Sequence, residues 1–187
     1  MRLGLLILIL FCQFALVAQR HFIENVGQHP SQVHHTVTVE GGAMFLENDR
    51  FTFNLIDRSL YLERHATPAM TNGEHIEIMG FAYQQHFLGA NDAVKITGRD
   101  IQPTTYNYFQ GQDKEQWAGG CRAMGEVVYD ELYPNVDLKV YSNDYFVKYD
   151  FIVQPGTDPS VIQWEYPGDA FVEIDHGQIS ISHSFGY

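Results

Sequence analysis

The amino-acid sequence predicts an all-β protein, an antiparallel β-sandwich of many short strands with at most one or two short helical turns. Beyond an apolar N-terminal segment, apolar and polar residues alternate with period two, as they do in strands that bury one face. No stretch keeps the three-to-four spacing of a substantial helix. Turn residues recur at intervals of about 8–12 residues, which is typical of sandwiches of antiparallel strands. Without intervening helices, a parallel α/β sheet is disfavoured.

The first element along the chain is a predicted secretory signal peptide, residues 1–18. Arg2 precedes an apolar stretch from Leu3 to Phe11, and small residues close the segment at Ala18. The stretch is shorter than the roughly 20 apolar residues that cross a bilayer. We therefore expect cleavage after Ala18 and an exported domain of residues 19–187, located in the periplasm, at the cell surface or outside the cell.

The remaining elements are expected to be strands joined by turns. Residues 63–74 are polar and irregular, and we expect a loop there. Turn-forming residues such as Asn48-Asp49, Pro134-Asn135 and His176-Gly177 separate the strands, and Asn135 tolerates the left-handed backbone conformation. The expected strands are Val33–Glu40, Ala43–Leu46, Phe51–Leu55, His75–Met79, Ala82–Phe87, Val94–Thr97, Tyr106–Phe109, Gly125–Tyr129, Leu138–Tyr141, Phe146–Val153, Ile162–Tyr166, Phe171–Ile174 and Gln178–Ser182.

Two of these elements have the clearest local signals. In Phe146–Val153, Lys148 and Asp150 alternate with four apolar residues that should share the core-facing side, namely Val147, Tyr149, Phe151 and Val153. The best short helical turn is Asp113–Trp117, with Asp113 as its N-cap and Trp117 turned inward.

Composition excludes some classes of partner. The chain has 23 acidic and 11 basic residues and a net charge of −12. A negative surface repels phosphate backbones and anionic lipids, so neither nucleic acid nor a membrane surface is an expected partner. After signal cleavage Cys121 is the remaining cysteine, so no intramolecular disulfide can form, and we expect its side chain to be buried.

The residues with reactive side chains form no recognised catalytic or metal-binding motif. Among nine histidines, the adjacent His34 and His35 would point to opposite faces of a strand. Zinc spacing, the D-x-D-x-D-G calcium loop and the G-x-S-x-G nucleophile motif are all absent from the sequence. We therefore predict no catalytic residue, cofactor or metal ligand. Carboxylate pairs of the glycoside-hydrolase type form in space rather than in sequence, so that activity stays as a third alternative.

Aromatic residues are the candidates for a binding surface. They are abundant in the second half of the chain and either fill a β-core or form an exposed surface for a sugar ring or a protein partner. The candidate binding residues are Tyr106, Tyr108, Trp117, Tyr133, Tyr145 and Trp164.

Five motifs, in order along the chain, resemble a known family. They are Phe22-Ile23-Glu24-Asn25-Val26-Gly27-Gln28, Phe87-Leu88-Gly89-Ala90-Asn91, Asn107-Tyr108-Phe109-x-Gly111-x-Asp113 with Trp117, Tyr129-x-x-Leu132-Tyr133-Pro134-Asn135-Val136-Asp137-Leu138, and Tyr149-Asp150-Phe151-Ile152-Val153-x-Pro155-Gly156-x-Asp158-Pro159-x-x-Ile162. Together they resemble the N-terminal domain of unknown function of secreted Bacteroidetes proteins with beta-propeller (SBBP-type) repeats and gliding-motility-type C-terminal sorting domains. Asn135 stands where that family usually has glycine.

The resemblance implies export and brings no catalytic residue. We expect a non-enzymatic structural or interaction module at the N-terminus of a secreted or cell-surface protein. Its partners would be downstream modules of the same polypeptide, or extracellular proteins or glycans. Because such proteins continue into repeats, whereas this sequence stops at Tyr187, we expect either a domain truncated at its C-terminal end or a short form of such a protein. The alternative function is a glycan-binding module that uses exposed Tyr and Trp side chains.

Overall fold

A computed structural model describes residues 20–56, 79–109, 111–143, 146–168 and 171–182. The predicted signal peptide, the loop expected at 63–74 and most of the strand expected at His75–Met79 lie outside these residues. The described elements are strands and two 3-10 turns, which confirms the all-β prediction. They are β1 (Phe22–Glu24), β2 (His35–Val39), β3 (Gly42–Leu46), β4 (Arg50–Ile56), β5 (Gly80–Phe87), β6 (Lys95–Tyr108), η1 (Lys114–Gln116), β7 (Ala118–Tyr133), β8 (Val136–Ser142), β9 (Val147–Val153), η2 (Pro159–Val161), β10 (Trp164–Glu165), β11 (Phe171–Asp175) and β12 (Gln178–Ser182).

The 16-residue strand β7 connects all parts of the main sheet. Along one edge it pairs with β6, from Lys95↔Asp130 to Tyr108↔Ala118. Its other edge pairs first with β1, at Ala123 and Met124, and then with β8, from Glu126 onward. Strands β1 and β8 therefore lie end to end along β7, and the Ser142 hydroxyl donates to the Arg20 carbonyl oxygen across the junction.

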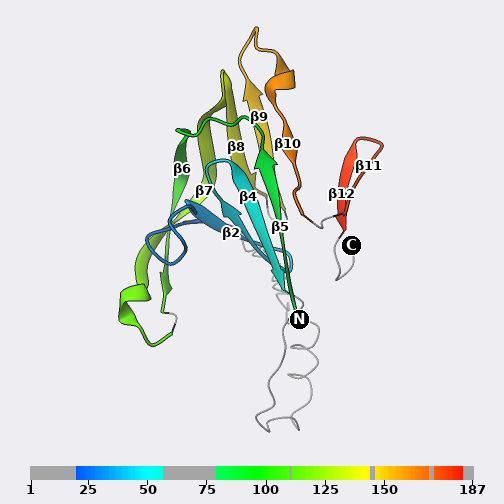
Figure 1. Ribbon diagram of the computed structural model, residues 1–187. Helices are drawn as coiled ribbons and strands as arrows, with labels where there is room; N and C mark the ends of the chain where they lie inside the picture. The colour runs from blue at the N-terminus through cyan, green and yellow to red at the C-terminus, as the bar shows by residue number, and fades with distance from the viewer. Residues whose placement is uncertain (1–19, 57–78, 110, 144–145, 169–170, 183–187) are drawn as a thin grey trace, which may run out of the picture.

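One half of β7 pairs with β1 and the other half with β8, and the antiparallel sheet therefore curls into two facing layers. The strand order is β10-β5-β4-β3-β2-β1-β7-β8-β9, with β6 beside β7 (Figure 1). Side chains from β4, β7 and β9 meet between the layers: the Phe51 ring lies 6.1 Å from that of Tyr129 and 5.8 Å from that of Tyr149. The predicted sandwich is thus formed by one continuous sheet. Strands β11 and β12 form a separate hairpin.

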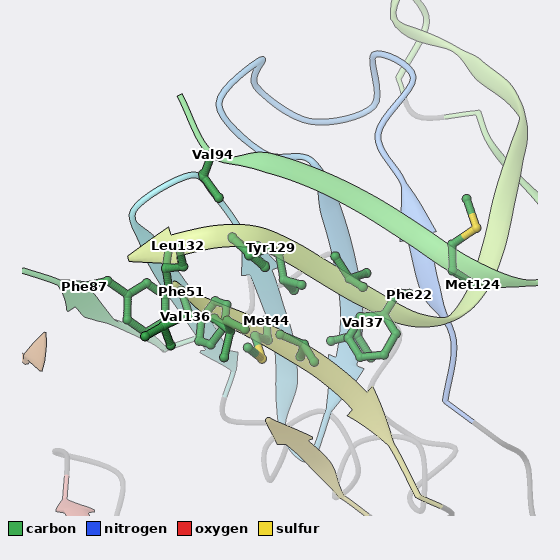
Figure 2. Close-up of a cluster of buried hydrophobic side chains, with 14 of the residues drawn as sticks. Phe22, Val37, Met44, Phe51, Phe87, Val94, Met124, Tyr129, Leu132 and Val136 are labelled. Atoms are coloured by element: carbon green, nitrogen blue, oxygen red, sulfur yellow. The ribbon is translucent and has the colours of Figure 1, made fainter. Parts of the chain in front are cut away.

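The core lies between these layers and is mainly aromatic and aliphatic (Figure 2). Its largest fully buried side chains include Tyr129, Tyr133, Phe22 and Phe51. The edge strands β9 and β10 close one side, where the rings of Phe151 and Trp164 stack with their centroids 6.0 Å apart. As predicted, the alternate residues of β9 divide between core and solvent, although Val153 at its end is exposed.

Several predicted turns are confirmed in their backbone detail. Asn135 has φ 60°, the left-handed conformation that asparagine tolerates, and it joins β7 to β8. His176 and Gly177 also have positive φ and connect β11 to β12. Asp113 caps η1 as predicted, accepting a hydrogen bond from the Glu115 backbone N–H. A second aspartate, Asp158, caps η2 in the same way.

Some predicted boundaries differ from the structure. The expected strands Val94–Thr97 and Tyr106–Phe109 correspond to the two ends of a single strand, β6, because the long pairing with β7 extends through the irregular residues between them. Val94 and Phe109 lie just outside β6. Strand β1 was not among the expected strands, since three residues are too few to show a period-two pattern. Within the described residues, no helix is long and apolar enough to span a membrane.

Candidate binding surface

The β6–β7 hairpin extends past its neighbours and carries the candidate binding surface at its η1 end. The first β7 residues, from Ala118 to Arg122, pair only with β6 among the described strands, because β1 begins to pair with β7 at Ala123. In Figure 1 this end of the hairpin reaches away from the two layers at the lower left. We call the segment from Tyr106 to Trp117 the hairpin tip.

Polar residues and glycine build the turn of the hairpin tip. The side-chain oxygen of Asn107 accepts a hydrogen bond from the Gly120 backbone N–H at 2.8 Å. Gly111 has φ 70°, which an L side chain rarely adopts. Asp113 accepts from the Glu115 backbone N–H at 3.0 Å. The polar groups of the Asn107–Trp117 motif are thus used to shape the turn, and its aromatic side chains remain for contact.

Three aromatic side chains of the hairpin tip reach solvent. Phe109 is 66% exposed, Trp117 39% and Tyr106 37%. The rings of Phe109 and Trp117 meet edge to face, 5.3 Å apart and at 70°. The Lys114 ammonium lies 5.6 Å from the centre of the Trp117 ring, and the indole N–H donates to the Gly111 carbonyl oxygen at 3.4 Å. The hairpin tip is therefore an apolar ridge with a cation beside it.

The sequence prediction that Trp117 turns inward is wrong. A single 3-10 turn lies above a two-stranded hairpin here, and no second layer among the described residues covers the indole ring, which is 39% exposed. The remaining contacts of Trp117 come from Phe109, Lys114 and Gly111.

Tyr108 anchors the hairpin tip to the body of the domain. It packs on a small buried cluster of Ile23, Ala118, Cys121 and Ala123, and burial raises the pKa of its hydroxyl. Its ring also lies 6.1 Å from that of His29 in the loop between β1 and β2. The prediction that Cys121 is buried is confirmed.

The structure separates the six aromatic residues that the sequence suggested for binding. Tyr106, Tyr108 and Trp117 lie together at the hairpin tip. Tyr133 is buried in the core, where its hydroxyl donates to the Gln163 carbonyl oxygen at 2.6 Å. Trp164 is partly buried and stacks on Phe151, and Tyr145 lies outside the described residues. Tyr133 and Trp164 therefore fill the core, which was the other interpretation of the aromatic residues.

Phe109 is the residue that sequence reasoning left out of the candidate set. It directly follows Tyr108 in the motif and is the most exposed aromatic side chain of the hairpin tip. The strand expected from the sequence included Phe109, whereas β6 ends at Tyr108, so the sequence did not show that Phe109 lies beyond the strand.

A hollow of about 460 Å³ lies beside the loop between β1 and β2. Asn25 shapes this loop: its amide nitrogen donates to the carbonyl oxygens of His29, Pro30 and Val33, and its side-chain oxygen accepts from the backbone N–H groups of Gly27 and His29. The hollow is lined by polar residues that include Glu24, His29, His34 and His35.

The ionisable groups around this hollow are largely satisfied or neutral. Arg122 donates two hydrogen bonds, of 2.6 and 2.7 Å, to the Glu24 carboxylate and lowers its pKa. Burial lowers the pKa of His35 to about 4, and burial also lowers the pKa of His29. Within the residues that the structure covers, no group of three or more His, Cys, Asp or Glu side chains could hold a metal ion. The His29 ring packs against that of Phe45, 5.2 Å away, and the His34 ring forms a hydrogen bond of 2.6 Å with the side-chain oxygen of Asn48.

A second hollow, of about 560 Å³, is an open apolar groove. It lies between β10 and the β11–β12 hairpin, and its lining includes Leu88, Trp164, Val172 and Ile174. Phe171 and Ile174 of the same hairpin are strongly exposed.

Comparison with known proteins identifies one family. Residues 22–187 match the family described as a domain of unknown function (DUF7948). No curated protein and no solved structure shows a match to the chain.

Proposed function

Because the chain belongs to the DUF7948 family, a domain of unknown function, we propose its role from its own surface: a non-enzymatic interaction module that contacts its partner through the hairpin tip. The observation that carries this proposal is the exposure of Phe109 and Trp117 at the end of a hairpin that projects past the two layers. Aromatic side chains contribute much of the energy of protein interfaces because they bury a large area with few rotatable bonds.

The module acts outside the cytoplasm in this proposal. The apolar N-terminal segment, residues 1–18, has the pattern of a signal peptide. The resemblance to N-terminal domains of secreted Bacteroidetes proteins points the same way. The partner is then a downstream module of the same polypeptide or an extracellular protein.

The geometry of the rings favours a protein partner over a glycan. Sugar binding by stacking uses the open face of an aromatic ring. Here Phe109 and Trp117 stand at 70° to each other, and the Lys114 ammonium lies over the Trp117 ring. Such a ridge fits an apolar groove better than it fits a flat sugar.

Site-specific cross-linking in the cells that make the protein tests this proposal. A photoreactive benzoylphenylalanine replaces Phe109, and in a matched control it replaces Phe171, which is also 66% exposed but lies on the β11–β12 hairpin. We expect one discrete adduct from position 109 and none from position 171. No adduct from position 109, or the same adducts from both positions, would contradict the proposal.

Glycan binding is the second candidate, and the exposure of Trp117 and Tyr106 supports it. Affinity electrophoresis through gels that contain a panel of polysaccharides provides the test. Retardation that is lost in Trp117→Ala would replace the protein partner by a glycan, whereas unretarded migration on every polysaccharide would argue against this candidate.

A further inference from the structure

The outer edge of β9 is unusual among the edges of the main sheet. Strand β9 ends the strand order, and no strand within the described residues pairs with its second edge. Its pairing with β8 runs without a register shift from Val136↔Val153 to Ser142↔Val147. By contrast, β6 contains Pro103 and register shifts, and β10 has two residues. Prolines, bulges and short length protect edge strands from pairing with other chains, and β9 has none of these features.

We propose that the edge of β9 pairs with β9 of a second copy, antiparallel and across a two-fold axis at Tyr149. A two-fold axis brings the same strand of both copies together and makes every contact occur twice. With the axis at Tyr149, Lys148 lies opposite Asp150 of the second copy, and Asp150 lies opposite its Lys148. The two residues face solvent on the outer side of β9.

Charge selects this register over its neighbours. An axis at Asp150 would place two carboxylates opposite each other, and an axis at Lys148 would place two ammonium groups opposite each other. Opposite charges on facing strands stabilise a pair by about 0.2–1 kcal/mol, and like charges destabilise it. An axis between two residues would bring core-facing and solvent-facing side chains to the same side of the sheet.

The neighbouring strand β8 places a lysine beside Asp150. In the register of β8 with β9, Lys139 lies opposite Asp150 and Tyr141 lies opposite Lys148. Lys139 also forms an ion pair with Glu126 of β7 at 2.5 Å. Across the proposed interface, Asp150 would therefore lie between Lys139 of its own chain and Lys148 of the second copy.

Apolar side chains extend the match at both ends of the edge. The same register places Phe146 opposite Ile152 of the second copy, and these side chains are 63% and 44% exposed in the single chain. Their burial would add a hydrophobic contact on each side of the ion pairs. The sequence of β9 is thus complementary to the same sequence read in the opposite direction. For this reason a second copy fits this edge.

Sedimentation velocity of the purified protein over a range of concentrations tests the proposal. We expect a reversible monomer–dimer equilibrium. The variant Lys148→Asp would leave two carboxylates facing each other in both pairs across the axis, and Asp150→Lys would leave two ammonium groups facing each other there. Each variant alone should therefore dimerise at least about tenfold more weakly than the original protein.

An equimolar mixture of the two variants is the decisive sample. In a mixed dimer, each of the two facing pairs would join one carboxylate of the Lys148→Asp chain to one ammonium group of the Asp150→Lys chain, so that both pairs combine opposite charges. The mixture should regain dimers that neither variant forms alone. Lys95→Asp, an equal charge change on β6, serves as the matched control and should dimerise like the original protein. Circular dichroism melting of each variant confirms that it is folded.

Three results would overturn the proposal. The first is an original protein that stays monomeric to about 1 mM, the range of a very weak association, which would leave the edge to an extended segment of a different protein. The second is a dimer that Lys148→Asp does not weaken. The third is a mixture of the two folded variants that remains monomeric.

Discussion

Phe51 and Phe109 have the same side chain, but the first lies in the core and the second at the surface. Phe51 lies on β4 between the two layers, is fully buried and contacts rings from β7 and β9. Phe109 follows β6 at the hairpin tip, where its ring meets Trp117 and solvent. The difference teaches that position relative to the two layers, and not residue type, decides whether an aromatic side chain of this domain stabilises the fold or remains for binding.

Phe51→Ala should have the largest effect, because it removes a ring from the centre of the core. Buried Phe→Ala changes cost about 3–5 kcal/mol through lost transfer energy and the cavity left behind. The free energy of unfolding, measured in urea, should fall by this amount. A loss below about 1 kcal/mol would mean that the layers do not enclose Phe51.

Acid should weaken the fold through His35, which is buried beside the β1–β2 loop. An unfolded histidine has a pKa near 6.5, whereas burial lowers the pKa of His35 in the fold to about 4. The neutral ring is thus favoured by folding, and its contribution is complete above about pH 6.5 and is lost as pH falls towards 4. Between pH 7 and 4.5 this loss amounts to about 2 kcal/mol.

The variant His35→Gln measures this contribution. Its free energy of unfolding should fall about 2 kcal/mol less than that of the original protein between pH 7 and 4.5. His176→Gln, at an exposed histidine, should follow the original protein. Parallel pH curves for His35→Gln and the original protein would exclude His35 as the source, since nearby Glu24, His34 and Arg122 also influence its charge.

Tyr129→Phe should have a small effect of the opposite sign. The Tyr129 ring is fully buried, and its hydroxyl has no hydrogen-bond partner among the described residues. An unpaired buried hydroxyl costs about 1–3 kcal/mol of desolvation, so its removal should leave the protein equally stable or up to about 1 kcal/mol more stable. Destabilisation by more than about 1 kcal/mol in urea would reveal a hydrogen bond to this hydroxyl.

Phe109→Ala should have the smallest effect on stability. Exposed side chains away from special backbone features change the free energy of unfolding by about 0.5 kcal/mol or less. Phe171→Ala is the matched control of equal exposure. A cost of 2 kcal/mol or more, on the order of a core change, would place Phe109 in the fold rather than at a binding surface.

The parts of the fold that depend on alternation were predictable. Val136, Leu138 and Val140 are buried on β8, and the charged Lys148 and Asp150 face solvent on β9, as period two requires. Turns were also predictable where one residue type suits the backbone, as with Asn135 at φ 60°. These signals are local, so the sequence contains them.

The binding surface was only partly predictable because it depends on how far one hairpin extends beyond its neighbours. Tyr108, Phe109 and Tyr133 are all aromatic, and the sequence allows each of them either in the core or at a binding surface. In the structure Tyr133 is buried and Phe109 is exposed. What separates them is the long pairing of β6 with β7 and the late start of β1, and both are tertiary features. A strand of three residues gives no periodic signal of its own.

The measurement that tests the central claim most directly is a competition for the cross-link at position 109. Excess unlabelled protein is added with the benzoylphenylalanine variant, either as the original chain or as the folded double variant Phe109→Ala/Trp117→Ala. We expect the original chain to suppress the adduct and the double variant to leave it intact, because the partner recognises the hairpin tip. Equal suppression by both proteins would show that the partner binds elsewhere on the domain and would contradict this account.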